Sequence, residues 1–272
     1  MLIHALSTEM IDLTSKIDAD VPGKAITTKP LATPFSRRGH LTWTAALLLV
    51  FCTQVSALTL TTEEYPPFNF STDGGKTITG SSSDLMREIM KRNGTSGTIT
   101  LYPWSRAFRM ALNDKNTCVY STTRTEAREK QFKWVGPLVP STWVLFAKGN
   151  SPLHANNLDE LKSYRIGGYQ GDAKAAFLKE RGFTVEETIN EEQNIKKLNA
   201  GRIDLWAATS EYGPWYAEKF NIKIKPILAF QEVFMYAACN RAMADEDIER
   251  MNAALKAIKA DGSYGRIMDA YR

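Results

Sequence analysis

The chain has 272 residues, of which 43% are hydrophobic and 24% are charged. This composition is typical of globular proteins and excludes the disordered and fibrous classes. The formal net charge at pH 7 is +4, with neither a basic stripe nor a run of like charges, so no nucleic-acid partner is expected.

A secretory signal peptide is predicted for residues 36–57. Arg37 and Arg38 form its positive region, and Leu41–Cys52 is an apolar run too short to span a bilayer comfortably. Val55-Ser56-Ala57 then places small residues at the cleavage positions. A buried core helix is the alternative, which the directional order of charge, apolar run and small residues disfavours. The mature protein is therefore expected to be soluble and periplasmic.

Residues 1–35 show no clear periodicity and are interpreted as a non-structural extension that comes from an upstream start codon. Sequencing the N-terminus of the secreted protein tests this interpretation, because no residue before Leu58 should then be found. Cys52 is not expected to carry a lipid anchor, since the bulky Val50-Phe51 precedes it.

Two cysteines, Cys118 and Cys239, remain after cleavage at Ala57. An oxidising compartment permits a disulfide between them. Two separate buried thiols are the alternative, because free cysteines are often buried. The sequence leaves both states open, with a slight preference for separate thiols.

The first part of the mature chain alternates strand and helix signals. Ser81-Ser82-Ser83 offers N-caps for a helix that Gly94 should stop. The elements expected here are strands at 58–61, 97–102 and 117–123, and helices at 84–90 and 105–112.

The alternation repeats in the second part. Gly171-Asp172 should open one helix, and Asn190 with Gln193 forms a capping box for another. Strands are expected at 165–169 and 203–207, β-rich connecting segments at 143–149 and 233–239, and a C-terminal helix that places Ile248, Met251, Leu255 and Ile258 on one face.

This order predicts an α/β fold of βαβ units, arranged as two α/β lobes joined by two crossing strands. Residues 58–146 should form the first part of lobe 1, and residues 147–232 should form lobe 2. Residues 233–272 should supply a crossing strand and complete lobe 1.

The mature chain lacks the residues that most types of catalytic site need. His154 is the one histidine after residue 57, so a Ser-His-Asp triad or a multi-histidine metal site has little material. No cofactor is expected. Catalysis by paired carboxylates stays open, because acidic residues are plentiful.

The segment from Ser121 to Arg128 contains side chains that are suited to binding an anionic ligand. It lies where a predicted strand ends and a helical stretch begins, and ligands of open α/β sheets bind at such ends. Hydroxyls and helix N-terminal amides favour an anion there, and an arginine can hold a carboxylate with two parallel hydrogen bonds. The alternative is that Arg124 and Arg128 are surface charges.

Four blocks in order give the mature chain a resemblance to the family 3 periplasmic solute-binding proteins, the polar amino-acid receptors of ABC transporters. The blocks are Glu64-Tyr65-Pro66-Pro67-Phe68, Ser121–Arg128 followed by Phe132–Pro137, Leu198–Asp204, and Asp261–Ile267. The resemblance implies a type II periplasmic-binding-protein fold, whose two lobes close on a ligand by a hinge motion.

The resemblance also implies binding roles for residues of lobe 1. Arg128 falls on the arginine that holds the ligand carboxylate, and Ser121 and Thr123 fall on nearby polar contacts. Tyr65 falls on an aromatic residue that covers the ligand, and Trp104 is near a second one. The other aromatic residues, Trp143 among them, are interpreted as packing.

In lobe 2 the resemblance is less complete. Gly171 and Asp172 fall on the loop and helix start that close over the ligand. The position of the acid that usually meets the ligand ammonium holds Thr209, with Glu211 two residues later. Asp172 could supply the missing charge, and the ligand need not be a standard α-amino acid.

The predicted function is that of a monomeric receptor without enzymatic activity. It would deliver a small polar carboxylate-bearing molecule, an amino acid or a derivative, to an ABC permease in the inner membrane. One alternative is a dehydratase-like enzyme on the same fold, with Asp172 or Glu211 as acid or base. Another is a sensory ligand-binding module.

Overall fold

The computed structural model describes residues 57–271. The predicted extension at 1–35 and nearly all of the predicted signal peptide lie outside the described residues. No helix between residues 57 and 271 is long and apolar enough to cross a membrane.

The described residues alternate strands and helices as predicted, with two elements, β6 and α6, that the sequence analysis did not identify. The strands are β1 (Leu58–Thr62), β2 (Gly97–Leu101), β3 (Thr117–Thr123), β4 (Lys133–Lys148), β5 (Ile166–Tyr169), β6 (Val185–Thr188), β7 (Leu205–Thr209) and β8 (Ile224–Cys239). The helices are α1 (Ser81–Asn93), α2 (Trp104–Asn113), α3 (Glu126–Glu129), α4 (Ala173–Glu180), α5 (Glu191–Asn199), α6 (Tyr212–Lys219), α7 (Asp245–Ala260) and α8 (Ser263–Asp269), with a short 3-10 turn at Asp159–Leu161.

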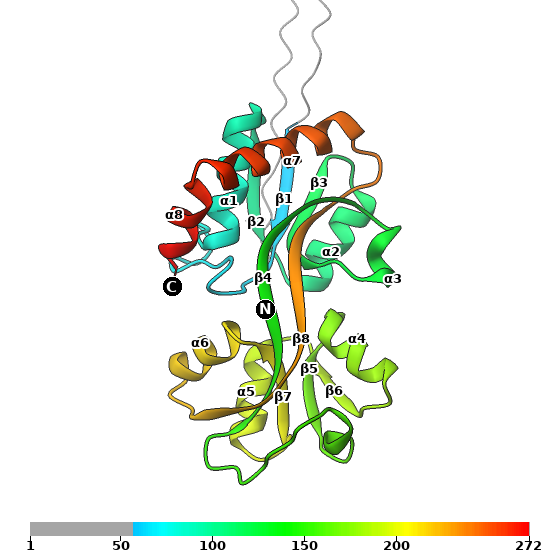
Figure 1. The fold of residues 1–272 in the computed structure, drawn as a ribbon, viewed down its shortest axis with the longest axis vertical. Helices are drawn as coiled ribbons and strands as arrows, with labels where there is room; N and C mark the ends of the chain where they lie inside the picture. The colour runs from blue at the N-terminus through cyan, green and yellow to red at the C-terminus, as the bar shows by residue number, and fades with distance from the viewer. Residues whose placement is uncertain (1–56, 272) are drawn as a thin grey trace, which may run out of the picture. The chain divides into compact units, whose positions relative to one another are not determined.

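The strands follow the order β2-β1-β3-β8-β4-β7-β5-β6. β1 runs parallel to β2 and β3, and β5 runs parallel to β6 and β7, as βαβ units require. β4 and β8 are each 16 residues long and pair antiparallel along their length. Figure 1 shows these two strands passing from one group of elements to the other. The fold is therefore two α/β lobes joined by two crossing strands.

Each lobe is named here by its elements. Lobe 1 contains β1–β3 with α1, α2, α3, α7 and α8, and lobe 2 contains β5–β7 with α4, α5 and α6 (Figure 1). The C-terminal helix α7 packs against α1 and β4, so the end of the chain completes lobe 1. The residue boundaries predicted between the lobes stay a prediction, because β4 and β8 run continuously through both.

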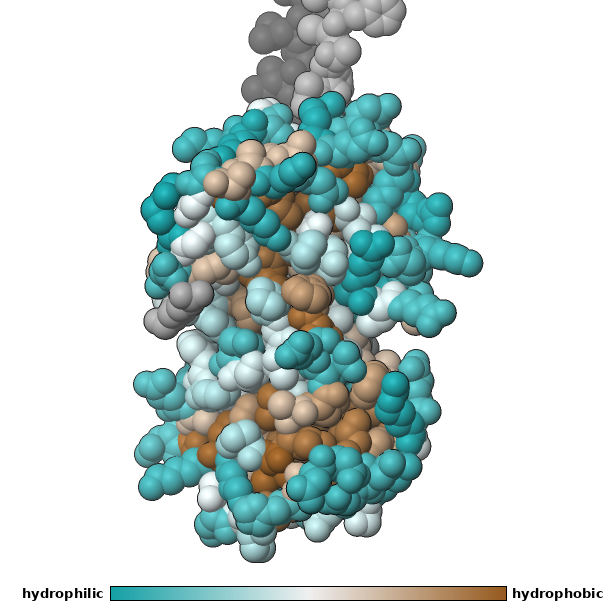
Figure 2. All heavy atoms as spheres, in the orientation of Figure 1, coloured by the Kyte–Doolittle hydropathy of each residue, from teal (hydrophilic) through white to brown (hydrophobic). Residues whose placement is uncertain are grey.

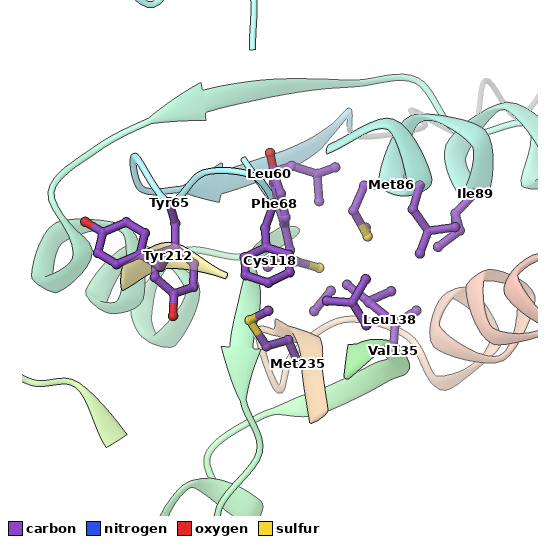
Figure 3. Close-up of a cluster of buried hydrophobic side chains, with 14 of the residues drawn as sticks. Leu60, Tyr65, Phe68, Met86, Ile89, Cys118, Val135, Leu138, Tyr212 and Met235 are labelled. Carbon is purple, nitrogen blue, oxygen red and sulfur yellow. The ribbon is translucent and has the colours of Figure 1, made fainter. Parts of the chain in front are cut away.

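The core of lobe 1 lies between α1, α7 and the sheet. Leu85, Met86 and Ile89 recur at helical spacing on α1 and are fully buried. Figure 3 shows Met86 and Ile89 beside Leu60 of β1 and Leu138 of β4, which lie far from them in the sequence. Burial of this apolar stripe fixes α1 on the sheet and thereby positions the loop that precedes it.

The start of α1 differs from the prediction. Ser81, Ser82 and Ser83 lie inside the first turn, and Gly80 is the N-cap residue without a side-chain cap. The Phe68 carbonyl instead accepts hydrogen bonds from the amides of Ser82 and Ser83, at 2.9 and 3.2 Å. A distant backbone group thus satisfies the free amides of the helix start.

Gly80→Ala should destabilise the fold by about 1–3 kcal/mol. The φ of Gly80 is +112°, and an added Cβ would lie 2.4 Å from the Phe68 carbonyl oxygen. Gly265→Ala in α8 is the matched control, since its Cβ meets nothing within 4 Å. Urea unfolding measures both, and an equal effect of the two substitutions would contradict this role of Gly80.

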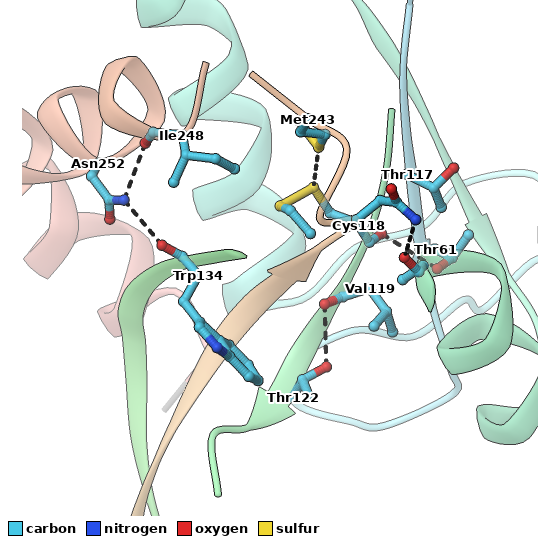
Figure 4. The surroundings of a disulfide bond; sticks show 12 residues. Thr61, Thr117, Cys118, Val119, Thr122, Trp134, Met243, Ile248 and Asn252 are labelled. Atoms are coloured by element: carbon cyan, nitrogen blue, oxygen red, sulfur yellow. Dashed lines mark hydrogen bonds between the residues drawn. A yellow bond between two sulfur atoms is a disulfide. The ribbon is translucent and has the colours of Figure 1, made fainter. Parts of the chain in front are cut away.

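A disulfide joins Cys118 of β3 to Cys239 of β8, with an S–S distance of 2.07 Å. The slight preference for separate thiols was therefore wrong. The register of β3 and β8 places the two residues directly opposite each other, which no local pattern reveals. Figure 4 shows the bridge buried within lobe 1, where the Met243 sulfur lies 3.6 Å from Cys118 Sγ.

Polar residues cover most of the face seen in Figure 2, and apolar residues reach the surface in lobe 2. One apolar groove of lobe 2 lies between β4, α6 and β8 and is lined by Val144, Phe146, Ser210, Pro214, Ala217, Ile224 and Pro226.

Candidate functional site

A cavity lies between the two lobes, at the carboxyl ends of β1, β3, β5 and β7. Such ends are where α/β sheets bind ligands. The lining residues come from both lobes and both crossing strands: Glu63, Tyr65, Trp104, Ser121, Thr123, Arg128, Ser141, Trp143, Asp172, Ala173, Lys174, Thr209, Val233 and Met235. Seven of the eight predicted site residues are in this set. The eighth, Gly171, touches two of its members.

The free volume of the central cavity is about 20 Å³, which holds about one water molecule. Hydrogen bonds cross it directly, from the Tyr65 hydroxyl to Thr209 Oγ1 at 3.4 Å and from Trp104 Nε1 to the Gly171 carbonyl at 2.9 Å. A larger ligand therefore requires the lobes to separate. β4 and β8 are the two connections that can bend for this motion.

Arg128 lies in the short helix α3 and points into the cavity. Its Nη1 donates to the Thr123 carbonyl at 3.2 Å and its Nη2 to the Gly171 carbonyl at 2.9 Å. Burial lowers the pKa of the guanidinium, and the charges of Asp172 and Glu63 oppose this effect. No carboxylate of residues 57–271 forms an ion pair with Arg128, so its charge is available to an anion.

Arg124, the other arginine of the predicted segment, has a partner on the surface. Its guanidinium donates to the carboxylate of Glu129 at 2.5 and 2.7 Å. Arg124 is exposed and lies outside the cavity lining. The interpretation of a surface charge therefore holds for Arg124, while the structure places Arg128 inside the cavity.

Hydroxyl groups surround the guanidinium side of the cavity. Ser121 has φ +57° at an irregularity of β3, and its hydroxyl donates to Oδ1 of the fully buried Asn69. Thr123 follows at the end of the strand, and Ser141 of β4 also lines the cavity. The sequence analysis did not identify Ser141, which lies in a long strand without a recognisable motif.

Two aromatic side chains enclose the cavity from lobe 1. Tyr65 is 8% exposed and Trp104 is 5% exposed. Trp104 also packs near the Arg128 guanidinium, which lies 5.4 Å from its ring centroid. Trp143, which was interpreted as packing, lines the cavity as well, so that interpretation was incomplete.

Asp172 is the N-cap residue of α4, and its carboxylate contacts Lys174 in the first turn of that helix. Its carboxylate accepts from the Lys174 amide at 2.7 Å, which caps the helix, and pairs with Lys174 Nζ at 2.5 Å. Lys174 is 3% exposed. Burial favours a lower pKa of Lys174, but the carboxylates around it reverse the shift and raise the pKa. The charge of Asp172 is therefore already balanced.

Thr209 brings no charge to the site. It is buried at the end of β7, and its Oγ1 accepts from the Tyr65 hydroxyl and, at 3.2 Å, from the Tyr212 amide. Glu211 lies outside the cavity lining and accepts from the hydroxyls of Ser141 and Ser210 at 2.9 and 2.8 Å.

Residues 58–164 match the family model described as bacterial extracellular solute-binding proteins, family 3. Over these residues the chain is similar to the family 3 solute-binding proteins. The ABC transporter arginine-binding protein 1 of Escherichia coli (strain K12) is 25% identical to it over 214 residues, which are 76% of this chain and 86% of that protein.

Solved structures share the family fold. A histidine kinase sensor domain with similarity to periplasmic binding proteins has a TM-score of 0.73 at 21% identity, covering 79% of this chain and 95% of that one. The arginine-, lysine-, histidine-binding protein ArtJ from Geobacillus stearothermophilus has a TM-score of 0.70 at 20% identity, with the same coverage. These likenesses establish the type II periplasmic-binding-protein fold.

The sequence analysis did not identify two acidic residues near the cavity. Glu63 directly follows β1 and lines the cavity. Burial raises the pKa of its carboxyl well above the usual range, and the charge of Asp172 adds to the shift. Glu191 begins α5 and accepts from Asn194 Nδ2 and Trp206 Nε1, at 2.8 and 2.9 Å. The pair Glu63-Glu64 precedes the Tyr65 motif, but nothing local tells which of the two faces the cleft.

Glu191→Gln should remove a decline of stability with rising pH. Burial raises the pKa of Glu191 to about 7 from its ordinary value of 4.5, so the folded protein holds a proton that the unfolded chain has lost. Stability should therefore fall between pH 4.5 and 7. The fall should be about 2–3 kcal/mol. Glutamine keeps an oxygen for Asn194 and Trp206.

Urea unfolding at pH 5 and pH 7.5 measures this difference. Glu192→Gln is the matched control, because Glu192 is only half-buried and pairs with the exposed Lys196. The same pH dependence in wild type and Glu191→Gln would exclude the role given to Glu191.

Proposed function

We propose that the mature protein is a periplasmic receptor that closes on a small polar carboxylate-bearing ligand and delivers it to an ABC permease of the inner membrane. The observation that carries this proposal is Arg128. It is a half-buried guanidinium without a carboxylate partner among residues 57–271, and it lies between two lobes among hydroxyls and aromatic rings. A planar guanidinium is suited to bidentate binding of a carboxylate.

A binding role is proposed for six of the eight predicted residues. Arg128 would hold the ligand carboxylate, with Ser121 and Thr123 as further hydrogen-bond partners. Tyr65 and Trp104 would cover the apolar part of the ligand. Gly171, whose carbonyl now accepts from both Trp104 and Arg128, would release them when the ligand enters.

An amino acid or a derivative is the proposed ligand class. The named function of the E. coli relative, arginine binding, and that of ArtJ support it. Family relatives are binding proteins, so the ligand should be released unchanged, and the receptor should act as a monomer. A solved sensor domain has the same fold, so signalling is the second candidate function beside transport.

A thermal-shift screen of residues 58–272 tests the proposal against amino acids, opines, small peptides and organic acids. A ligand that binds the folded state raises the melting temperature. We expect a shift with a carboxylate-bearing class that is lost in Arg128→Ala, and recovery of the ligand without chemical change. A shift that survives Arg128→Ala would contradict the proposal, and turnover of the ligand would indicate an enzyme.

A further inference from the structure

The cavity contains a buried ammonium group that belongs to the protein itself. Lys174 lies in the first turn of α4, is almost fully buried and lines the cavity. A lysine ammonium group has three N–H donors. The Asp172 carboxylate accepts from one of them at 2.5 Å, and no other group of residues 57–271 accepts from this ammonium. Two donors inside a binding cavity are therefore left for a ligand.

Lys174 is placed beside the polar end of the cavity wall in lobe 2. Its Nζ lies 5.8 Å from the centroid of the Tyr65 ring, and the hydroxyl of the same ring donates to Thr209 Oγ1 at 3.4 Å. Thr209 is neutral, and the charge of Asp172 is balanced by Lys174 itself. Lobe 2 therefore presents hydrogen-bond donors of an ammonium group to a ligand whose carboxylate is bound by Arg128 of lobe 1.

We propose that the Lys174 ammonium group donates hydrogen bonds to an oxygen atom near the carboxylate of the ligand. The ligand class is thereby a carboxylate with a second oxygen acceptor and no free α-ammonium group: a 2-hydroxy acid, a 2-oxo acid or an N-acyl amino acid. All three are derivatives of amino acids, so the inference rests on the proposed function and narrows its ligand class.

The charges of the lining disfavour an ammonium group on the ligand. The lining contains the bases Arg128 and Lys174 and the acids Glu63 and Asp172, whereas Glu191, which acts on Lys174 electrostatically, lies outside it. Burial raises the pKa of Glu63 well above its usual range, which favours its neutral form. The cations of the lining then outnumber its anions by the charge of Arg128, which a single ligand carboxylate balances. A ligand ammonium would be a buried charge without a partner, which is costly.

The test compares compounds that share a carbon skeleton and differ at the α-nitrogen. The sets are L-glutamate with 2-hydroxyglutarate and 2-oxoglutarate, L-phenylalanine with phenyllactate and phenylpyruvate, and L-arginine with N-acetyl-L-arginine, measured by titration calorimetry. In the set that wild type binds most tightly, an oxygen-bearing compound should bind about tenfold or more tightly than the amino acid, as a hydrogen bond to a charged group predicts. Tighter binding of the amino acid would overturn this inference alone, provided that Arg128→Ala weakens every compound of the set.

Lys174→Met should abolish the preference for the oxygen-bearing compound, because methionine keeps most of the side-chain length and has no donor. Lys174→Met/Asp172→Asn is a second variant that removes both charges of the pair and keeps a capping side chain at the start of α4. In it, the two compounds should bind within about threefold of each other. Lys179→Met on the same helix is the matched control, since Lys179 pairs with Glu187 at the surface. A preference that survives in the double variant, or an equal loss in Lys179→Met, would overturn the inference.

Discussion

Arg128→Ala is expected to weaken binding of the carboxylate ligand about 30-fold or more. This corresponds to about 2 kcal/mol or more, the usual loss when one partner of a buried, hydrogen-bonded charge pair is removed. The guanidinium is half-buried near Trp104 and has no carboxylate partner among the described residues, so no other group replaces its charge. Titration calorimetry with the ligand found by the thermal-shift screen measures the change.

Arg124→Ala is the control that separates this effect from general loss of surface charge. Arg124 lies four residues away, is exposed, and pairs with Glu129 at the surface. Its loss should change the affinity less than about threefold, since exposed pairs contribute little. Equal and small effects of the two substitutions would show that Arg128 does not bind the ligand.

Replacement of both bridged cysteines by alanine should lower the free energy of unfolding by about 5 kcal/mol. The bridge closes a loop across a sequence separation of 121 residues, and restriction of the unfolded chain grows with the logarithm of this length. Urea unfolding of wild type and Cys118→Ala/Cys239→Ala gives the difference. Because the bridge lies inside lobe 1 and outside the cavity lining, a folded double variant should keep its ligand affinity.

A reducing agent supplies the control for the disulfide. It should shift the unfolding midpoint of wild type toward that of the double variant, and it should leave the double variant unchanged. A loss of less than 1 kcal/mol on reduction, well below the usual effect of a native disulfide, would show that the bridge contributes little to stability.

The short strands β1, β2 and β3 of lobe 1 were predictable because their signals are local, whereas β6 of lobe 2 was missed. β3 was expected at the residues where it lies, and β1 and β2 differ from expectation by one residue at an end. These strands are rich in apolar and β-branched residues and lie between turn residues; β1 and β3 are mostly buried, while β2 is a partly exposed edge strand.

The two crossing strands were found only in part. β4 begins at Lys133 and β8 at Ile224, about ten residues earlier than the predicted segments. Pro137, Pro140 and Pro226 lie in the missed halves, and proline argues against a strand because it cannot donate to the ladder. The pairing of β4 with β8 tolerates these residues through register shifts at several points.

In the candidate site, too, the residues of one local motif were predictable, and the residues brought together only by the fold were not. Arg128, Ser121 and Thr123 lie within one motif, so the family resemblance could assign them. Lys174 and Glu63 belong to different lobes and meet only through the fold. The role of each residue depends on its neighbours in the folded structure. Lys174 balances the charge of Asp172, and the Glu63 carboxyl lies beside the Tyr169 hydroxyl.

A crystal structure of residues 58–272 with the ligand from the screen tests the central claim most directly. We predict that the ligand lies between the lobes, with its carboxylate on the Arg128 guanidinium. A ligand bound outside this cavity, or one inside it whose carboxylate does not contact Arg128, would contradict the receptor mechanism proposed for this protein.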